Sequence, residues 1–397
     1  MARSSPPRVE PAAVGDGVGV RDRRWWGYAV GVPLGLYVLT RVVQLTLVVL
    51  LAEPGGPALA DRLMVWDATF FVDVAEDGYP HGFTYGPHGE FIGNGLAFFP
   101  LYPLLIRVFS WLPWLTPNGA ALLVSGIAGA AGAVLLSLLG TRLYNRQTGY
   151  ALAVLFGAQP MSVVLSMGYT EALFAALVIA TLLAVHHNAW LLAGGLGLLA
   201  GLTRPTGLAL GGALLLAALW YLWHNRTPRD YPSWRVAAGV LAALAGTPLY
   251  LFWVGLRVGD LGAWFTMEDR GWGTRWDYGA STWRFLADTF SGGKGWVEVS
   301  TALIIVGVAL SILVALSERV WLPLSLYGVF GFVMAIGSSG YYHSRPRMLL
   351  PELLWLIPVA IVLGRARPRT AALVLVGVTL LGCWYGAYMI TVWPFTI

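Results

Sequence analysis

Residues 27–52, GYAVGVPLGLYVLTRVVQLTLVVLLA, decide the fold class of this chain of 397 residues. The stretch exceeds the roughly 20 apolar residues that cross a bilayer as a helix, and comparable runs recur toward the C-terminus. Because 57% of the residues are hydrophobic, 11% are charged and the mean hydropathy is +0.68, the chain lies outside the range of soluble globular proteins. The apolar runs are continuous rather than alternating, which predicts helices and not a β-barrel. We expect an all-α polytopic membrane protein.

The apolar runs predict about eleven crossings. They are expected at 27–52, 118–141, 148–167, 171–187, 189–202, 206–223, 236–258, 298–317, 320–338, 347–364 and 370–391. With residues 1–24 as a disordered cytoplasmic tail, most arginines between the runs fall on cytoplasmic turns, as the positive-inside bias requires. The run 189–202 is too short to cross a core of about 30 Å, so 189–223 could instead form two kinked or half-inserted helices.

The remainder, 25–397, is expected to form one transmembrane domain of a multi-pass plasma-membrane protein with two large extracytoplasmic loops, 53–117 and 259–297. The spacing of apolar residues in the first loop predicts amphipathic surface helices near 66–76 and 101–114. The second loop combines many Trp and Gly residues with acids such as Glu268 and Asp277, a mixture common in sugar-binding clefts.

Asp67 is the candidate catalytic residue. It follows the first apolar run closely, lies in the first long loop and neighbours the aromatic Trp66. A carboxylate in this position can act as a general base toward a hydroxyl. The alternative interpretation is that Asp67 caps the amphipathic helix, since Asp is a favoured N-cap residue. Asp73 and Asp77, further along the same helix, are expected to be solvated or to orient the helix.

Several motifs resemble those of PIG-V-like mannosyltransferases, the family of the second mannosyltransferase of GPI-anchor assembly and its bacterial relatives. They are Trp66-Asp67, Phe70-Phe71, Ala75, Gly78-Tyr79, Ala97-Phe98-Phe99-Pro100-Leu101-Tyr102-Pro103, Tyr169-Thr170-Glu171-Ala172-Leu173-Phe174-Ala175 and Thr203-Arg204-Pro205-Thr206-Gly207. The eukaryotic members carry an acid a few positions before the Ala-Phe-Phe-Pro block, whereas the nearest acid here is Glu90. The 49 Gly and the near absence of Lys are typical of a GC-rich bacterial genome, for which an actinobacterial source is expected.

The resemblance implies the GT-C glycosyltransferase fold and an inverting transfer of mannose from polyprenyl-phosphate-mannose to a hydroxyl of a glycolipid or cell-wall glycan. It places the acid in the first extracytoplasmic loop, at Asp67, and it directs attention to five substrate-binding candidates: Trp66, Tyr79, Phe99, Tyr169 and Glu171. No cofactor beyond the lipid-linked donor is expected, and the sequence shows no metal-ligand cluster that would support a divalent ion.

The donor phosphate calls for arginines, because a guanidinium binds phosphate oxygens through two parallel hydrogen bonds. The candidates are Arg204, His343, Arg345 and Arg347. The last three lie on the extracytoplasmic side, where the positive-inside bias disfavours them. Two alternatives remain open: the loop arginines extend to lipid headgroups, or Arg204 forms a structural ion pair with Glu171. Arg41, inside the first apolar run, fits either a structural or a phosphate-binding role.

Other function classes fit less well. Nucleic-acid binding is not indicated, because the arginines are dispersed at the ends of apolar runs and form no basic face. A transporter or flippase would show repeat symmetry and polar residues along several helices. A scaffold would not explain an acidic, aromatic loop opposite an arginine-rich one. Among enzymes, an arabinofuranosyltransferase or a protein O-mannosyltransferase of the GT-C class is the nearest alternative.

Overall fold

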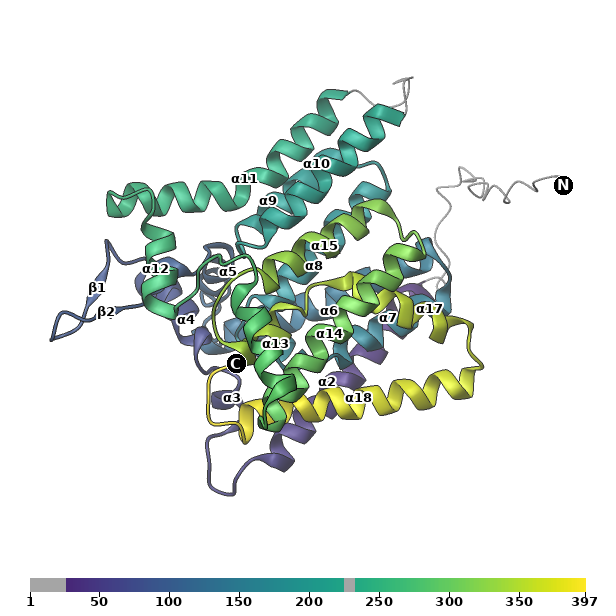
Figure 1. The fold of residues 1–397 in the computed structure, drawn as a ribbon, viewed down its shortest axis with the longest axis horizontal. Coiled ribbons are helices and arrows are strands. Elements are labelled where there is room, and N and C mark those ends of the chain that lie inside the picture. The colour runs from purple at the N-terminus through teal and green to yellow at the C-terminus, as the bar shows by residue number, and fades with distance from the viewer. Residues whose placement is uncertain (1–25, 225–232) are drawn as a thin grey trace.

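The structure is a computed structural model that describes residues 26–224 and 233–397. The expected cytoplasmic tail at 1–24 therefore lies outside the described residues. The described chain is mainly helical, with a short antiparallel hairpin in which β1 (Thr84–Tyr85) pairs with β2 (Phe91–Ile92). The hairpin projects from one end of the helical body (Figure 1).

Apart from the hairpin, the described elements are all helical. In chain order they are η1 (Gly27–Gly31), α2 (Val32–Leu51), α3 (Leu59–Arg62), α4 (Asp67–Asp77), η2 (Gly95–Ala97), α5 (Leu101–Phe109), α6 (Pro117–Leu143), α7 (Arg146–Ala158), η3 (Ser162–Ser166), α8 (Glu171–His186), α9 (Trp190–Gly201), α10 (Gly207–His224), α11 (Ser233–Val258), α12 (Ala263–Trp272), α13 (Ala280–Ser291), α14 (Trp296–Ser317), α15 (Leu322–Ile336), η4 (Tyr342–Ser344), α16 (Arg345–Met348), η5 (Leu353–Trp355), α17 (Leu356–Arg365) and α18 (Pro368–Thr391).

Five helices of the described chain are long and apolar enough to cross a membrane: 27–51, 117–143, 233–258, 296–317 and 368–391. A sixth candidate is the pair 342–348 and 353–365, which is bent by 75°. Helices α8, α9, α10 and α15 are apolar but shorter. The multi-pass architecture is confirmed, and the number of eleven crossings stays a prediction.

The expected span at 148–167 is wrong as a single helix, because α7 ends at Ala158 and the 3-10 segment η3 follows. Pro160 and the left-handed backbone of Met161, with φ 63°, stop the α-helix. The guanidinium of Arg41 donates to the carbonyl oxygens of Gly157 and Ser162 at this break. Carbonyls left without partners at a helix end need such donors, so Arg41 has a structural role.

The expected span at 347–364 is also not continuous. It is divided between the short α16 and the later η5 and α17. Pro351 lies in the break, where its missing N–H and its ring prevent a regular helix, and Tyr327 donates to its carbonyl oxygen at 3.1 Å. The break leaves Arg345 and Arg347 on a four-residue helix, with both side chains buried.

The region 189–223 forms two helices, as expected, and α9 is 12 residues long. At about 1.5 Å per residue it is too short to cross a bilayer core as a regular helix. It packs very closely on α11, since a Cβ placed on Gly194 would lie 2.5 Å from Gly239 Cα. Small residues at such contacts let helix backbones approach in a membrane. The turn after α9 carries Arg204.

The two predicted surface helices of the first loop are present as α4 and α5. Helix α4 buries Ala68, Phe71 and Val74 and leaves Asp73 and Asp77 exposed. Helix α5 ends at Phe109, earlier than the expected residue 114, and Trp111 and Trp114 follow it with exposed rings.

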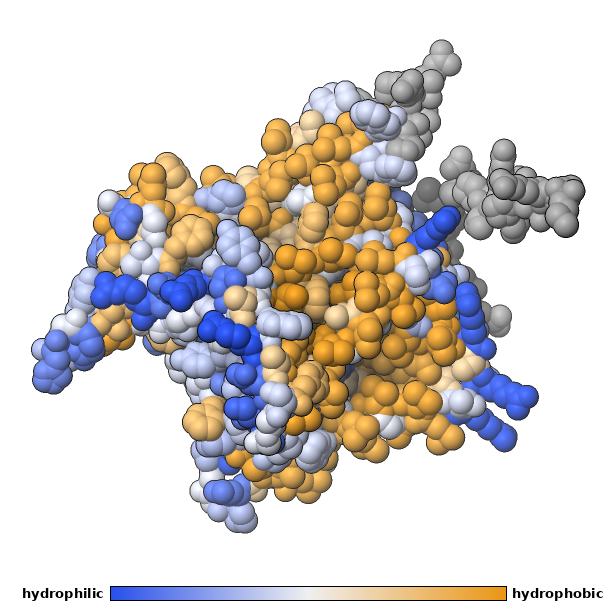
Figure 2. Space-filling model, in the orientation of Figure 1, coloured by the Kyte–Doolittle hydropathy of each residue, from blue (hydrophilic) through white to orange (hydrophobic). Residues whose placement is uncertain are grey.

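A broad apolar surface lies between two hydrophilic margins (Figure 2). One margin carries the hairpin, α12 and α13, while the opposite margin lies near the turn between α17 and α18 (Figures 1 and 2). The apolar surface includes the exposed side chains of Leu303 and Leu313 of α14 and of Leu373 and Leu381 of α18. An apolar surface of this kind between polar ends is typical of a protein embedded in lipid.

Candidate functional site

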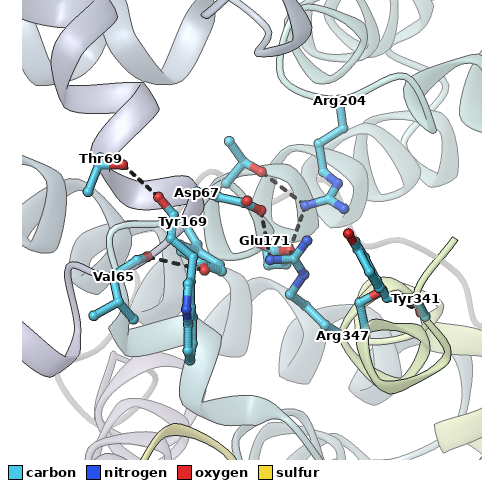
Figure 3. Close-up of polar contacts among 11 residues, drawn as sticks. Val65, Asp67, Thr69, Tyr169, Glu171, Arg204, Tyr341 and Arg347 are labelled. Carbon is cyan, nitrogen blue, oxygen red and sulfur yellow. Dashed lines mark hydrogen bonds and ion pairs between the residues drawn. The ribbon is translucent and has the colours of Figure 1, made fainter. Parts of the chain in front are cut away.

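Four charged side chains meet where the first loop reaches the helical body (Figure 3). Asp67 is the first residue of α4, and Glu171 is the first residue of α8. Arg204 lies in the turn between α9 and α10, and Arg347 lies on α16. Segments distant in the sequence thus supply one cluster of two carboxylates and two guanidiniums, called the charge cluster below.

Ion pairs connect all four members. Arg347 Nη1 lies 2.8 Å from Asp67 Oδ2, and Arg347 Nε lies 3.4 Å from Glu171 Oε1. The same Glu171 oxygen lies 2.7 Å from Arg204 Nη1, which also donates to Thr170 Oγ1 at 3.0 Å. The expected Arg204–Glu171 pair is therefore present, but it is one part of a larger cluster.

Exposure differs within the charge cluster. The side chain of Glu171 is 1% exposed, whereas that of Asp67 is 28% exposed. A buried carboxylate needs its partners, because removing one partner of a buried ion pair costs about 3–5 kcal/mol. Glu171 is thus placed as the internal counterion of both arginines, while Asp67 lies at the accessible edge.

The local backbone directs Asp67 into the charge cluster. Trp66, immediately before α4, has φ 56° and ψ −117°, a conformation that is rare for a bulky side chain. Such strained residues concentrate at functional sites. The interpretation of Asp67 as an N-cap is wrong, because Trp66 occupies that position and no side chain caps the helix.

Tyr169 packs against the charge cluster. Arg347 Cζ lies 5.1 Å from the centre of the Tyr169 ring, within the range of a cation–π contact. The Tyr169 hydroxyl donates to Val65 O at 3.3 Å, just before Trp66. Tyr169 therefore connects the arginine to the strained turn that presents Asp67.

The structure separates the other phosphate-binding candidates from the charge cluster. The guanidinium of Arg345 donates to the carbonyl oxygens of Ala335 and Ser338 and is buried. His343 is buried against the rings of Tyr341 and Tyr342. Among the four basic candidates, Arg204 and Arg347 are the two brought together.

Tyr79 and Phe99 lie in an aromatic cluster against α11 rather than at the charges. The Tyr79 hydroxyl donates to Phe98 O at 2.8 Å, and Phe99 is buried against Tyr250 with ring centres 4.5 Å apart. Their contacts anchor the first loop to α11. Glu90 accepts a hydrogen bond from His88 N within the hairpin and is not in the charge cluster.

The second loop contributes a carboxyl that the sequence did not single out. Burial, followed by the negative charge of Asp67, raises the pKa of Glu268 on α12 to about 8, and Arg204 acts in the opposite direction. A raised carboxyl pKa near a charged site is a recognised feature of functional residues. The available signal was the acidic, tryptophan-rich composition of 259–297, which did not distinguish Glu268 from its neighbours.

The site combines cationic groups suited to a phosphate with a carboxylate suited to a hydroxyl. Two guanidiniums lie within ion-pair distance of one buried carboxylate, and a second carboxylate lies at the accessible edge. In the described chain no group of three or more His, Cys, Asp and Glu side chains is arranged to hold a metal ion.

Residues 38–209 match the mannosyltransferase (PIG-V) family. The matched segment contains Asp67, the Ala-Phe-Phe-Pro block, Glu171 and Arg204. The predicted family resemblance is confirmed. The GPI alpha-1,6-mannosyltransferase 2 of Rattus norvegicus is 32% identical over 168 residues, which are 40% of this chain and 32% of the rat protein. The chain thus aligns with about a third of that relative's length.

Solved structures share the fold of this chain. ArnT from Cupriavidus metallidurans bound to undecaprenyl phosphate superposes with a TM-score of 0.54 at 18% identity, over 88% of this chain and 63% of that chain. The apo oligosaccharyltransferase of Archaeoglobus fulgidus gives a TM-score of 0.52 at 12% identity, over 92% of this chain and 56% of that chain. The predicted GT-C fold is confirmed. At these identities the likeness shows the fold.

Proposed function

We propose that the protein is an inverting mannosyltransferase that uses polyprenyl-phosphate-mannose and acts on a hydroxyl of a glycolipid or glycan. The observation that carries the proposal is the Asp67–Arg347 ion pair of 2.8 Å, linked through Glu171 to Arg204. A sugar phosphate brings its own leaving group, so the site needs one base and cationic donors for the phosphate. The match of residues 38–209 to the mannosyltransferase family favours mannose.

In the proposed reaction, Asp67 accepts the proton of the acceptor hydroxyl while the hydroxyl oxygen attacks C1 of the mannose. The bond from C1 to the phosphate oxygen breaks on the opposite face, which inverts the anomeric centre. The lipid phosphate leaves with the bonding electron pair. Arg347 and Arg204 stabilise the charge that develops on it, as guanidiniums do for transferring phosphoryl oxygens.

The resting ion pair fits this sequence of events. Asp67 and an incoming phosphate compete for Arg347, whose Nη1 holds the carboxylate at 2.8 Å. When the phosphate takes over the guanidinium, Asp67 loses its ion-pair partner, and its carboxylate is free to accept the proton of the acceptor hydroxyl. In this proposal, donor binding activates the acceptor site.

The location is part of the proposal. We propose that the loops with Asp67 and Glu268 lie on the extracytoplasmic face of the plasma membrane, with the N-terminus in the cytoplasm, an orientation that the positive-inside bias favours. The undecaprenyl phosphate in the ArnT complex supports a lipid-linked substrate for this fold. Another GT-C transferase, acting on arabinofuranose or on a protein hydroxyl, is the alternative to be tested.

The test is transfer of radiolabelled mannose by purified protein, with a panel of lipid and glycan acceptors followed by lipid extraction. We expect Asp67→Asn to lower turnover by about 10²–10⁴-fold with donor binding largely retained, because the general base is lost. Asp73→Asn is the matched control, since Asp73 lies exposed on the same helix. Turnover of Asp67→Asn at the level of Asp73→Asn would remove Asp67 from the mechanism.

A further inference from the structure

Helix α12 of the second loop is fixed against the first loop by tryptophans one turn to either side of Glu268. Trp264 Nε1 donates to Ala97 O at 3.2 Å. The Trp272 ring packs edge-on against Phe70 of α4, with ring centres 5.8 Å apart, and against Phe98 at 5.6 Å. Residues four apart share a helix face. The face of α12 that meets the first loop therefore carries Glu268.

This placement brings the carboxyl of Glu268 within electrostatic range of the charge cluster. The charged groups that act on it most strongly are Asp67 and Arg204. The Glu268 side chain is half-buried, and none of the hydrogen bonds or ion pairs found among the described residues uses its carboxyl. Buried polar groups are generally paired, so a carboxyl left unpaired beside a site is available to a ligand.

We propose that Glu268 binds a sugar hydroxyl of the substrates and positions it beside Asp67. The inference rests on the proposed function and adds the second loop to the site. A carboxyl can accept a hydrogen bond from one hydroxyl and, when neutral, donate to a second oxygen, which matches the vicinal hydroxyls of a sugar. The hydroxyl belongs to the transferred mannose or to the acceptor, and both share this chemistry.

The protonation state gives the proposal a distinct signature. With a pKa of about 8, Glu268 is mostly neutral at pH 7 and ionises as the pH rises above 8. Ionisation removes the donor and adds a second negative charge next to Asp67. The other groups facing Glu268 are Arg204, which opposes this effect, and Tyr250 of α11, while Asp269 and Arg270 neighbour it on α12. Substrate binding is therefore expected to weaken at alkaline pH.

The experiment measures kcat, KM and equilibrium binding for polyprenyl-phosphate-mannose and for a mannosylated glycolipid acceptor between pH 6 and 9.5. For the wild type, we expect the KM of one substrate to rise up to about tenfold per pH unit above pH 8, with a smaller change in kcat. Glu268→Gln keeps a neutral carboxamide, so it should bind nearly normally at pH 7 and lose the alkaline rise. The substrate whose KM responds identifies the source of the hydroxyl.

Glu268→Ala should raise that KM about tenfold at all pH values, the effect of losing one or two hydrogen bonds. Asp269→Asn, an exposed neighbour on the same helix, is the matched control and should keep the wild-type profile. The proposal is overturned if Glu268→Gln retains the alkaline rise, or if Glu268→Ala binds both substrates like the wild type. If the wild type binds a sugar lipid with the Glu268-dependent profile but transfers no mannose, the proposed function fails and the assignment of Glu268 stands.

Discussion

At the residue scale, the properties of the charge cluster depend on how Arg347 divides its guanidinium between two carboxylates. One terminal nitrogen holds Asp67 at the accessible edge, and Nε faces the buried Glu171. The planar fork of an arginine can satisfy both directions at once, whereas the ammonium of a lysine acts as a point charge. Arg347 therefore orders Asp67, the proposed base, and its counterion Glu171 before any substrate is present.

The first residue-scale prediction compares Arg347→Lys with Arg345→Lys. If Arg347 binds the donor phosphate, its replacement should weaken donor affinity by roughly ten- to a hundredfold, since hydrogen bonds to charged groups contribute about 1.5–3 kcal/mol. Arg345→Lys should lower thermal stability with little change in donor affinity, because the Arg345 guanidinium donates to the carbonyls of Ala335 and Ser338. Donor titrations on both variants make the comparison. Equal affinity losses would place both arginines at the phosphate.

Sequence reasoning found Arg204 because a charge in an apolar stretch is costly, and Arg347 because the positive-inside bias disfavours it. It found Asp67 and Glu171 through their place in the motifs of the family resemblance. It could not separate Arg345 from Arg347. These residues are two apart on a four-residue helix, which directs their side chains about 160° apart, and only the helix itself reveals which one faces Asp67. Glu268 could not be singled out, because its proximity to Asp67 depends on how Trp264 and Trp272 dock α12.

At the scale of elements, too, the sequence predicted some features and missed others. The amphipathic pattern predicted α4 and α5, because a surface helix needs one apolar face. The breaks after α7 and after α16 were missed, although Pro160 and Pro351 were visible signals, because apolar length outweighed them in the interpretation. Side chains from other helices donate hydrogen bonds to backbone carbonyls at these breaks. Arg41 of α2 does so after α7, and Tyr327 of α15 does so after α16.

The contact between α9 and α11 gives an element-scale prediction. Gly194→Ala should destabilise the protein by about 1–3 kcal/mol, because the new Cβ would lie 2.5 Å from Gly239 Cα and the helices would have to separate. Gly195→Ala is the control on the same helix, since no atom lies within 4 Å of its Cβ position. It should be neutral or stabilise by up to about 1 kcal/mol through helix propensity. Thermal unfolding in detergent distinguishes the two, and equal stabilities would mean that α9 and α11 are not in close contact.

The α9–α11 contact also matters for the site. Arg204 follows α9 directly, and Leu202 O in the same turn accepts a hydrogen bond from Leu101 N at the start of α5. A displaced α9 would therefore move Arg204 relative to Glu171. We expect Gly194→Ala to lose activity beyond its loss of folded protein, which links helix packing to the chemistry proposed for the charge cluster.

At the scale of the whole molecule, the apolar surface and its two hydrophilic margins define a direction through the membrane (Figure 2). The hairpin, α12 and α13 share one margin (Figure 1), and α12 packs through Trp272 on Phe70 of α4, the helix that begins at Asp67. The side of the membrane on which this margin lies determines which class of sugar donor the site would use. A lipid-phosphate sugar suits an extracytoplasmic site, whereas a cytoplasmic site would favour a nucleotide sugar.

The last prediction tests that orientation by cysteine labelling of intact cells. On a Cys383→Ser background, Tyr85→Cys in the hairpin and Ala280→Cys at the start of α13 should react from outside, because both positions are exposed on the loop side. Gln147→Cys, exposed near the start of α7, should react only after permeabilisation. Cys383 is buried, so its removal eliminates background labelling with little change to the surface. The reverse pattern would place Asp67 and Arg347 in the cytoplasm and exclude the proposed extracytoplasmic transfer, while leaving the geometry of the cluster unchanged.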